Sequence, residues 1–202
     1  MIVIIDYDMG NLRSVQNGFA QAGFSTIISG DPQALKAADG LVLPGVGAFG
    51  RAMDNLCERG LDQLVYGLAK DGVPILGICV GLQLLFDCSE ELGKHRGLSL
   101  IPGQVVKFGG ELKVPHVGWN QLEIKREHKL LHGVHSGDYV YFVHSYYAQP
   151  VHPQVVLAVS EYGGPFTAVV QHGNIFGIQF HPEKSSRVGI RILQNFGSLV
   201  EG

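Results

Sequence analysis

The stretch VPILGICVGLQLLF, residues 73–86, decides how the chain is expected to fold. Its first part, VPILGI, is a short apolar run bounded by turn residues, which is typical of a strand buried inside a parallel sheet. The segment that follows Cys79, VGLQLLFD (80–87), favours a helix. Cys79 therefore lies where a strand is predicted to give way to a helix, and Gly77 and Gly81 bracket it.

The rest of the first half repeats this alternation of strands and helices. Short apolar runs predict strands over 2–6, 24–28 and 40–44, and segments with helical spacing predict helices over 11–23 and 48–72. Strands that alternate with helices indicate βαβ units. The expected fold is therefore an α/β fold with a mostly parallel sheet, covered by helices on both faces.

The second half has a different pattern. From about residue 98, short strand-like runs are separated by turn residues such as Gly109-Gly110, and a final helix is predicted over 185–200. Consecutive strands of this kind indicate antiparallel additions to the same sheet, or a second sheet. Because we find no internal repeat and no linker, we expect residues 1–202 to form a single domain.

Composition and charge argue against several classes of protein. The 202 residues are 46% hydrophobic and 16% charged, with a net charge of -3 and no basic block, which argues against binding to nucleic acid or an anionic membrane. No apolar run reaches the roughly 20 residues of a spanning helix, and the first residues lack the basic region of a signal peptide. Three cysteines without a CxxC motif predict reduced thiols in a cytoplasmic protein.

Cys79 is a candidate nucleophile. The carboxyl end of a strand is where open α/β sheets bind ligands, and flanking glycines allow the sharp turn of a nucleophile elbow. The N-terminus of the following helix favours the thiolate. The alternative is a small buried side chain, which is the usual role of a free cysteine. We adopt that alternative for Cys57 and Cys88, because they lie within helical patterns without such glycines.

A thiol nucleophile needs a base, and His181 is the best candidate among the nine histidines. It ends the predicted strand NIFGIQF, and Pro182 after it fixes the backbone. Glu183 follows at i+2, where a carboxylate can orient the imidazole as the acid of a triad does. On its own, the HPE segment fits better a surface turn before a helix. Its pairing with G-x-C-x-G favours the triad.

The loop PGVGAFG, residues 44–50, follows another predicted strand. Its three glycines allow backbone N–H groups to turn towards a developing oxyanion. A phosphate cradle is the alternative, but no GK[ST] follows, which excludes a P-loop. No GxGxxG follows the first strand either, so a dinucleotide site is not expected. We expect neither a cofactor nor a metal.

Taken together, these residues resemble the triad (class I) glutamine amidotransferases. Five segments are similar, more narrowly, to the glutaminase subunits of imidazole glycerol phosphate synthases of histidine biosynthesis: DYDMGNLRSV (6–15), PGVGAFG (44–50), PHVGWN (115–120), YFVHSYY (141–147) and QFHPEKSS (179–186). The resemblance covers nearly the whole chain and implies a three-layer α/β fold. One departure is Asp8, where the family more often has glycine.

The resemblance implies a reaction and a set of residues for it. The Cys79 thiolate would attack the side-chain amide of glutamine, and His181, oriented by Glu183, would carry a proton to the leaving ammonia and then activate water. The oxyanion would be held by the N–H of Val80 and by one from the loop that contains Val46 and Gly47. The positions that match residues holding glutamine are Gly45, Gly47, Gln83, Glu91, Ser145 and Tyr146. The alternative for Gln83 and Glu91 is an exposed helix surface.

The resemblance also implies a partner. Ammonia would pass to a separate (β/α)₈-barrel cyclase subunit, in a heterodimer that makes imidazole glycerol phosphate and aminoimidazole carboxamide ribonucleotide. The positions that match that interface are Asn11, Trp119, Tyr141 and Lys184. Trp119, between a glycine and an asparagine, is expected in a turn, and a core aromatic is the alternative.

Three other functions stay open on the sequence alone. The first is a glutaminase that serves another synthesis, such as that of pyridoxal phosphate or anthranilate. The second is a stand-alone cysteine hydrolase or peptidase on a related α/β scaffold, which needs no partner. The third is a flavodoxin-like binding module in which Cys79 only packs.

Overall fold

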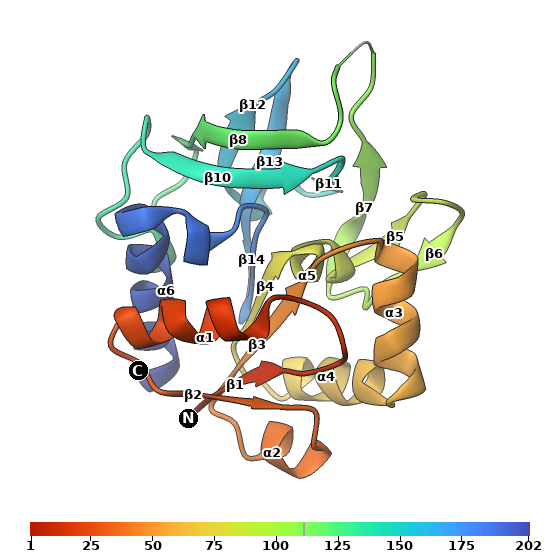
Figure 1. Ribbon diagram of the computed structural model, residues 1–202, viewed down its shortest axis with the longest axis vertical. Coiled ribbons are helices and arrows are strands. Elements are labelled where there is room, and N and C mark those ends of the chain that lie inside the picture. The colour runs from red at the N-terminus through yellow and green to blue at the C-terminus, as the bar shows by residue number, and fades with distance from the viewer. Residues whose placement is uncertain (111) are drawn as a thin grey trace.

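The computed structural model describes residues 1–110 and 112–202, and an eight-stranded sheet runs through it (Figure 1). The strand order is β2 (Thr26–Ser29), β1 (Ile2–Ile5), β3 (Gly40–Gly45), β4 (Ile75–Cys79), β14 (Ile175–Ile178), β13 (Pro165–His172), β12 (Val156–Glu161) and β9 (Glu123–Ile124). The first five strands in this order are parallel, and the last three are antiparallel to their neighbours. The predicted α/β fold, mostly parallel with antiparallel additions, is confirmed.

The second half also forms two smaller sheets. A two-stranded ribbon pairs β8 (His116–Gln121) with β10 (Tyr139–His144). A four-stranded sheet has the order β11 (Tyr146–Pro150), β7 (Ile101–Lys107), β5 (Phe86–Ser89) and β6 (His95–Arg96). The second half therefore uses both arrangements that its sequence pattern allows.

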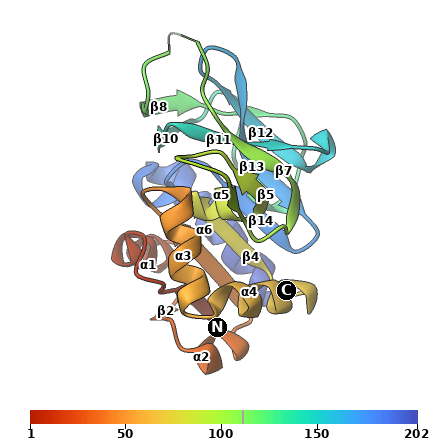
Figure 2. The ribbon, with the colours of Figure 1, turned by 90° about the vertical axis from the view of Figure 1, so that its right-hand side faces the viewer.

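Helices cover both faces of the parallel strands. They are α1 (Leu12–Gln21), α2 (Pro32–Lys36), α3 (Phe49–Glu58), α4 (Leu61–Lys70), α5 (Val80–Leu84) and α6 (Ser186–Glu201), and a 3₁₀ turn, η3, spans Pro182–Lys184. Phe176 of β14 packs on Phe196 of α6, whereas a Cβ on Gly177 would meet Leu82 of α5. Since neighbouring residues of a strand face opposite sides, α6 and α5 cover opposite faces (Figure 2). None of the helices in the two described ranges is long and apolar enough to cross a membrane.

Two predicted elements are wrong. The helix after Cys79 ends at Leu84, and Phe86–Ser89 form strand β5, because this segment pairs with β7. Cys88 therefore lies in a strand and not in a helix. The segment around Trp119 is not a turn but strand β8, since β10 supplies a pairing edge that a local pattern does not reveal. Long-range pairing overrides local preference at both places.

Helix α2 was not predicted from the sequence. Helix α2 begins after Asp31, whose side chain accepts a hydrogen bond from the N–H of Gln33, and Pro32 occupies the first helical position. Both features are ordinary signals of a helix start. The helix has only one and a half turns, too short for a helical period to stand out.

Candidate active site

Three neighbouring strand ends bring the predicted site residues together. Strands β3, β4 and β14 are adjacent and parallel, with Gly45 opposite Cys79 and Ile178 opposite Ile78. The loop after β3, the cysteine after β4 and His181 after β14 therefore meet at one edge of the sheet. This is the carboxyl edge, where parallel α/β sheets bind ligands.

The turn at Cys79 depends on its two glycines. Cys79 has φ 57°, in the left-handed region that L side chains rarely adopt. A Cβ on Gly81 would lie 1.7 Å from the carbonyl oxygen of Leu43, and one on Gly77 would lie 2.6 Å from that of Gly81. The expectation that these glycines allow the turn to close is confirmed. Strain of this kind gathers at functional sites, where the surrounding structure holds it in place.

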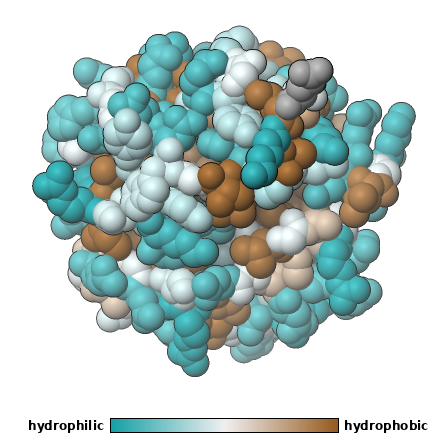
Figure 3. All heavy atoms as spheres, turned by 45° about the horizontal axis from the view of Figure 1, so that its top comes forward, coloured by the Kyte–Doolittle hydropathy of each residue, from teal (hydrophilic) through white to brown (hydrophobic). Residues whose placement is uncertain are grey.

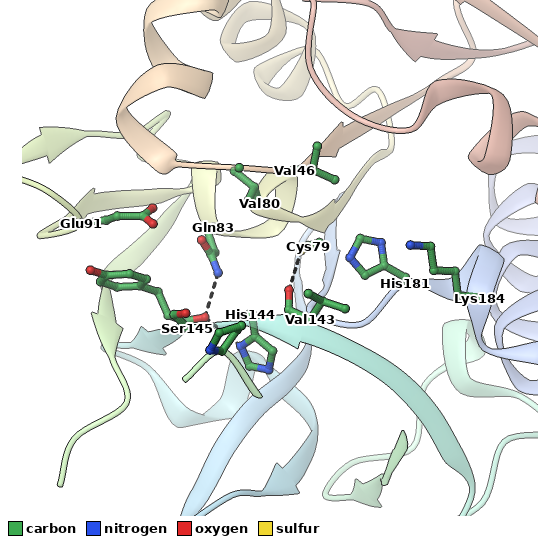
Figure 4. A pocket seen from close by; sticks show the side chains of 13 residues that line it. Val46, Cys79, Val80, Gln83, Glu91, Val143, His144, Ser145, His181 and Lys184 are labelled. Atoms are coloured by element: carbon green, nitrogen blue, oxygen red, sulfur yellow. Dashed lines mark hydrogen bonds between the residues drawn. The ribbon is translucent and has the colours of Figure 1, made fainter. Parts of the chain in front are cut away.

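The Cys79 thiol is buried, with 3% of the residue exposed. Its Sγ lies 3.9 Å from the carbonyl oxygen of Val143 and 3.9 Å from Nε2 of Gln179. His181 stands beside Cys79 in Figure 4, close enough for the cysteine to raise the pKa of the imidazole.

His181 and Glu183 form a buried pair. Nδ1 of His181 lies 3.0 Å from Oε1 of Glu183, and their side chains are 7% and 2% exposed. Burial alone would lower the pKa of His181, but the hydrogen bonds and charges of Cys79 and Glu183 outweigh it and raise the pKa to about 10. The imidazole is therefore protonated at neutral pH and can donate a proton from Nε2.

A cavity of about 290 Å³ opens beside the cysteine. Most of the predicted site residues line it: Val46, Gly47, Cys79, Val80, Gln83, Glu91, Ser145, Tyr146, His181 and Lys184. Two residues predicted for catalysis or substrate binding do not line the cavity. Gly45 pairs with Cys79 in the sheet, and Glu183 lies beside the imidazole of His181. The cavity is at the small end of ligand sites, which suits a molecule the size of an amino acid.

Gln83 presents an acceptor to the cavity. Its Nε2 donates to the carbonyl oxygen of Tyr146 at 2.9 Å (Figure 4). The same nitrogen donates to Oε1 of Gln179 at 3.1 Å, which uses both amide hydrogens. Oε1 of Gln83 is then the group left for a ligand, and it can only accept. The residue is 3% exposed, so its assignment to a helix surface is wrong.

Glu91 lies in a turn after β5, so it is not on a helix either. One carboxylate oxygen accepts the N–H of Phe49 at 2.7 Å, at the first residue of α3. This contact satisfies a donor that no side chain of the helix itself caps. A carboxylate in the cavity wall is suited to bind an ammonium group.

The loop over the cavity has one fixed end and a free middle. The buried hydroxyl of Tyr7 donates to the carbonyl oxygen of Pro44 at 2.5 Å. Gly47 has φ 88°, and Val46 is 41% exposed. Outside the strand ladders, no hydrogen bond within residues 1–110 and 112–202 holds the backbone of either. The peptides at Val46 and Gly47 can therefore turn more easily than the one before them.

Of the four residues that match an interface, Lys184 lines this cavity. Trp119 is 51% exposed, and its ring lies 5.9 Å from that of Tyr141, its partner across the ribbon. Its assignment as a core aromatic is therefore wrong. Lys184 is exposed at the cavity wall, and Asn11 is exposed just before α1, which contacts η3. Exposed apolar side chains accompany them, namely Val46, Val117 and Tyr139, and Figure 3 shows apolar groups breaking the polar surface of this end.

Several residues of the site were not identified from the sequence. Pro115, Val143 and His144 line the cavity, and Gln179 contacts both Cys79 and Gln83. Gln179 stands two residues before His181, so the two-residue period of a strand could have placed both on one side. Nothing in the local pattern indicates the contacts of the other three.

Comparisons with known proteins agree with this geometry. The family model described as "Glutamine amidotransferase class-I" matches residues 3–199. A protein of Syntrophotalea carbinolica named "Imidazole glycerol phosphate synthase subunit HisH" is 53% identical over 98% of this chain and 100% of its own length. Proteins of the same name from Moorella thermoacetica and Halobacterium salinarum are 51% and 52% identical, over 98% and 96% of this chain and 95% and 91% of theirs.

Solved structures match in fold. A crystal structure titled as a glutamine amidotransferase aligns over 100% of this chain and 99% of its own, with a TM-score of 0.78 and 19% identity. The structure of PurLQS from Thermotoga maritima aligns over 98% and 97%, with a TM-score of 0.78 and 17% identity. The resemblance read from the motifs is confirmed: the chain belongs to the class-I glutamine amidotransferase family and, within it, to the group of imidazole glycerol phosphate synthase HisH subunits.

Proposed function

We propose that the chain is the glutaminase subunit of an imidazole glycerol phosphate synthase and hydrolyses L-glutamine to supply ammonia for histidine biosynthesis. The observation that carries this proposal is the meeting of Cys79 with the His181–Glu183 pair beside a cavity of amino-acid size. Relatives named HisH, about half identical over nearly whole chains, favour this synthesis over those of pyridoxal phosphate or anthranilate.

The first half of the reaction forms a thioester. The Cys79 thiolate attacks the side-chain amide carbon of glutamine, and the carbonyl oxygen becomes an oxyanion. The C–N bond then breaks as protonated His181 gives its Nε2 proton to the departing nitrogen, which leaves as ammonia. The Glu183 carboxylate at Nδ1 keeps the ring oriented for this transfer.

The second half hydrolyses the thioester. The now neutral His181 takes a proton from water as that water attacks the thioester carbon. The C–S bond breaks, glutamate leaves, and the thiolate and imidazolium are restored together. The oxyanion in both halves is placed near the N–H of Val80, the first residue of α5, and near the loop with Val46 and Gly47.

Glutamine itself is held by its polar ends. Glu91 binds the α-ammonium group, and Oε1 of Gln83 accepts a hydrogen bond from the substrate. Ser145 and Tyr146 also line the cavity. No cofactor takes part in any step, and we place the reaction in the cytoplasm, where the thiol stays reduced.

The partner we propose is a (β/α)₈-barrel cyclase subunit, bound to the end of the molecule with Asn11, Trp119, Tyr141 and Lys184. Exposed aromatic and apolar groups around a cavity are typical of a protein-binding surface. Docking there would cover the mouth of the cavity and direct ammonia into the cyclase instead of into water.

Free ammonia tests this division of labour. In the complex with the cyclase, Cys79→Ala is expected to lose glutamine-dependent synthesis but to retain synthesis from ammonium salts at alkaline pH, because the cyclase chemistry needs only ammonia. Product formation with each nitrogen source measures this. A variant complex that is inactive with both sources, while the wild-type complex uses both, would assign Cys79 a structural role.

The raised pKa of His181 predicts a pH profile. Because the imidazolium persists up to a pH of about 10, hydrolysis is expected to stay level from neutral pH to near that value and to fall above it. Glu183→Gln removes one of the charges that raise the pKa of His181, so the alkaline limb should move to lower pH. Rates of glutamate formation from pH 6 to 10.5 locate this alkaline fall in the wild type and in Glu183→Gln. A fall at the same pH in both proteins would contradict the pairing of His181 with Glu183.

The same ion pair has a consequence for stability. A folded-state pKa above the ordinary value of about 6.5 stabilises the fold fully below that pH, and the contribution is lost as pH rises through about 10. Thermal unfolding of the wild type and of Glu183→Gln at pH 7 and pH 10 measures this contribution. The wild type should lose more stability between these pH values than Glu183→Gln does.

A further inference from the structure

Two buried histidines outside the triad face each other across the β8–β10 ribbon. His116 and His144 are register partners, each 6% exposed, and Nδ1 of His116 lies 3.2 Å from Nε2 of His144. The reaction described above uses neither ring. His144 nevertheless lines the cavity.

The pair belongs to a longer chain of hydrogen bonds. At one end, Nδ1 of His144 lies 2.9 Å from the carbonyl oxygen of Tyr146. At the other end, Nδ2 of Asn120 lies 3.4 Å from Nε2 of His116 and 2.7 Å from the carbonyl oxygen of Glu161. The N–H of Gln121 donates to Oδ1 of Asn120, which fixes the orientation of that amide.

The ends of this chain determine where its protons lie. A carbonyl oxygen only accepts, so His144 must carry its proton on Nδ1, and its Nε2 is an acceptor in the neutral ring. His116 must then donate from Nδ1, which leaves its Nε2 to accept from Asn120. The same direction follows from the amide of Asn120, because its nitrogen is the group that faces Glu161. Both ends therefore require the Nδ1–H tautomer in both rings.

The surroundings keep both rings neutral. His116 stacks between Tyr162, with ring centres 4.2 Å apart, and Phe142, at 5.2 Å. His144 packs on Phe108 and Phe166, at 5.2 Å and 5.1 Å. Burial lowers the pKa of His144 to about 3 and lowers the pKa of His116 as well. Because both rings stay neutral, hydrogen bonds along the chain are donated in one direction only, from Asn120 towards the Tyr146 carbonyl.

This chain of hydrogen bonds ends at the Tyr146 carbonyl, in the wall of the cavity. The Tyr146 carbonyl that accepts from His144 also accepts from Nε2 of Gln83, so it joins the relay to the α5 wall of the cavity. The strand that carries His144 also contacts both catalytic candidates. Its Val143 carbonyl lies against the thiol of Cys79, and its Tyr141 carbonyl accepts the N–H of His181.

We propose that His116 and His144 are positioning residues for glutamine. They form a neutral relay that runs from Asn120 through both rings to the Tyr146 carbonyl and holds the Ser145–Tyr146 wall in the orientation that receives the substrate. This inference rests on the proposed glutaminase function. Its rival is that the two rings only fill an aromatic cluster, in which case the direction of donation has no effect on glutamine.

A spectroscopic test does not depend on activity. In the full-length chain labelled with ¹⁵N-histidine, long-range ¹⁵N–¹H correlations distinguish a protonated ring nitrogen from a bare one. His116 and His144 should both show a proton on Nδ1 and none on Nε2 at pH 7. A proton on Nε2 of either ring, or a charged ring, would overturn the relay.

Kinetics test its effect on the substrate. In the complex with the cyclase, His116→Phe keeps a ring in the aromatic stack but leaves Nε2 of His144 without its donor. We expect KM for glutamine to rise about tenfold, as for the loss of one buried hydrogen bond, with kcat changed by less than about threefold. His116→Asn restores a donor near the Nδ1 position, and KM should return to within about threefold of the wild-type value.

A matched control separates the relay from packing. Tyr162→Leu removes one of the two rings stacked on His116, together with the hydroxyl that donates to the carbonyl oxygen of Lys113, and leaves the relay atoms in place, so it should leave KM unchanged. An unchanged KM in His116→Phe, or equal losses in His116→Phe and His116→Asn, would favour packing alone and overturn the proposal. If the wild-type complex hydrolyses no glutamine, the proposed function fails, and the tautomer spectrum still decides whether the relay exists.

Discussion

Cys79→Ala is expected to reduce glutamine hydrolysis by roughly a thousandfold or more, because removing a nucleophile leaves only the residual effects of binding and electrostatics. The thiol lies against His181 at the one sharp turn that presents it to the cavity, and no other cysteine lines that cavity. Steady-state formation of glutamate by the complex with the cyclase measures the loss. Circular dichroism and co-purification with the cyclase should be unaffected.

The other two cysteines are the controls for this experiment. Cys57 is exposed on α3, and Cys88 lies on β5. Cys57→Ala and Cys88→Ala should hydrolyse glutamine at close to the wild-type rate. Turnover above a few per cent in Cys79→Ala would exclude this residue as the nucleophile, and a large loss in either control would point to a different thiol.

The second large effect concerns the partner. The free chain is expected to bind glutamine but to turn it over at least ~100-fold more slowly than the complex loaded with the cyclase ligand, since losing one oxyanion donor costs roughly 3 kcal/mol of barrier. The loop supplies a physical basis. Tyr7 fixes the Pro44 carbonyl, whereas outside the strand ladders no hydrogen bond among the described residues holds the peptides at Val46 and Gly47.

Such a peptide can adopt two orientations at small steric cost. In one, a carbonyl oxygen points at the oxyanion site and opposes charge there; in the other, an N–H group does and stabilises it. Val46 is exposed at the proposed partner surface, so docking can bias the peptide towards the productive orientation. Equal kcat values for the free chain and the loaded complex would eliminate this switch in favour of a permanently formed site.

Sequence patterns predicted the parallel half of the fold well and the second half in outline. Fully buried strands such as β1 and β4 read as continuous apolar runs, so their type does not depend on distant partners. Strand β8 could not be found in this way, because its glycine and asparagine favour a turn and only pairing with β10 makes it a strand. The segment Phe86–Ser89 is a second example, because only its pairing with β7 makes it strand β5.

For the site, backbone signals identified Cys79 and His181 from the chain itself, whereas Gln83, Glu91, Ser145 and Tyr146 were predicted only through the family resemblance. The glycines around Cys79 and the proline after His181 mark special backbone positions, which a single sequence reveals. Tyr7 and Gln179 act through contacts with segments 37 and 100 residues away, and no local pattern encodes such a contact. The partners of His144 could not be predicted for the same reason.

Asp8 shows a departure from the family pattern that the structure explains. It has φ 64°, the left-handed conformation for which glycine is the default and aspartate one of the better-tolerated alternatives. Arg59 lies 2.7 Å from its carboxylate and also donates to the carbonyl oxygen of Asp6. The side chain thus gains an ion pair at a position where glycine has none.

Covalent labelling tests the central claim most directly. The complex is incubated with an electrophilic diazo-ketone analogue of glutamine, with and without excess glutamine, and the chain is digested and analysed by mass spectrometry. We predict one label per chain, on Cys79, with glutamine protecting against it. A label on Cys57 or Cys88, or labelling of Cys79 that glutamine does not slow, would contradict the assignment of this site to glutamine hydrolysis.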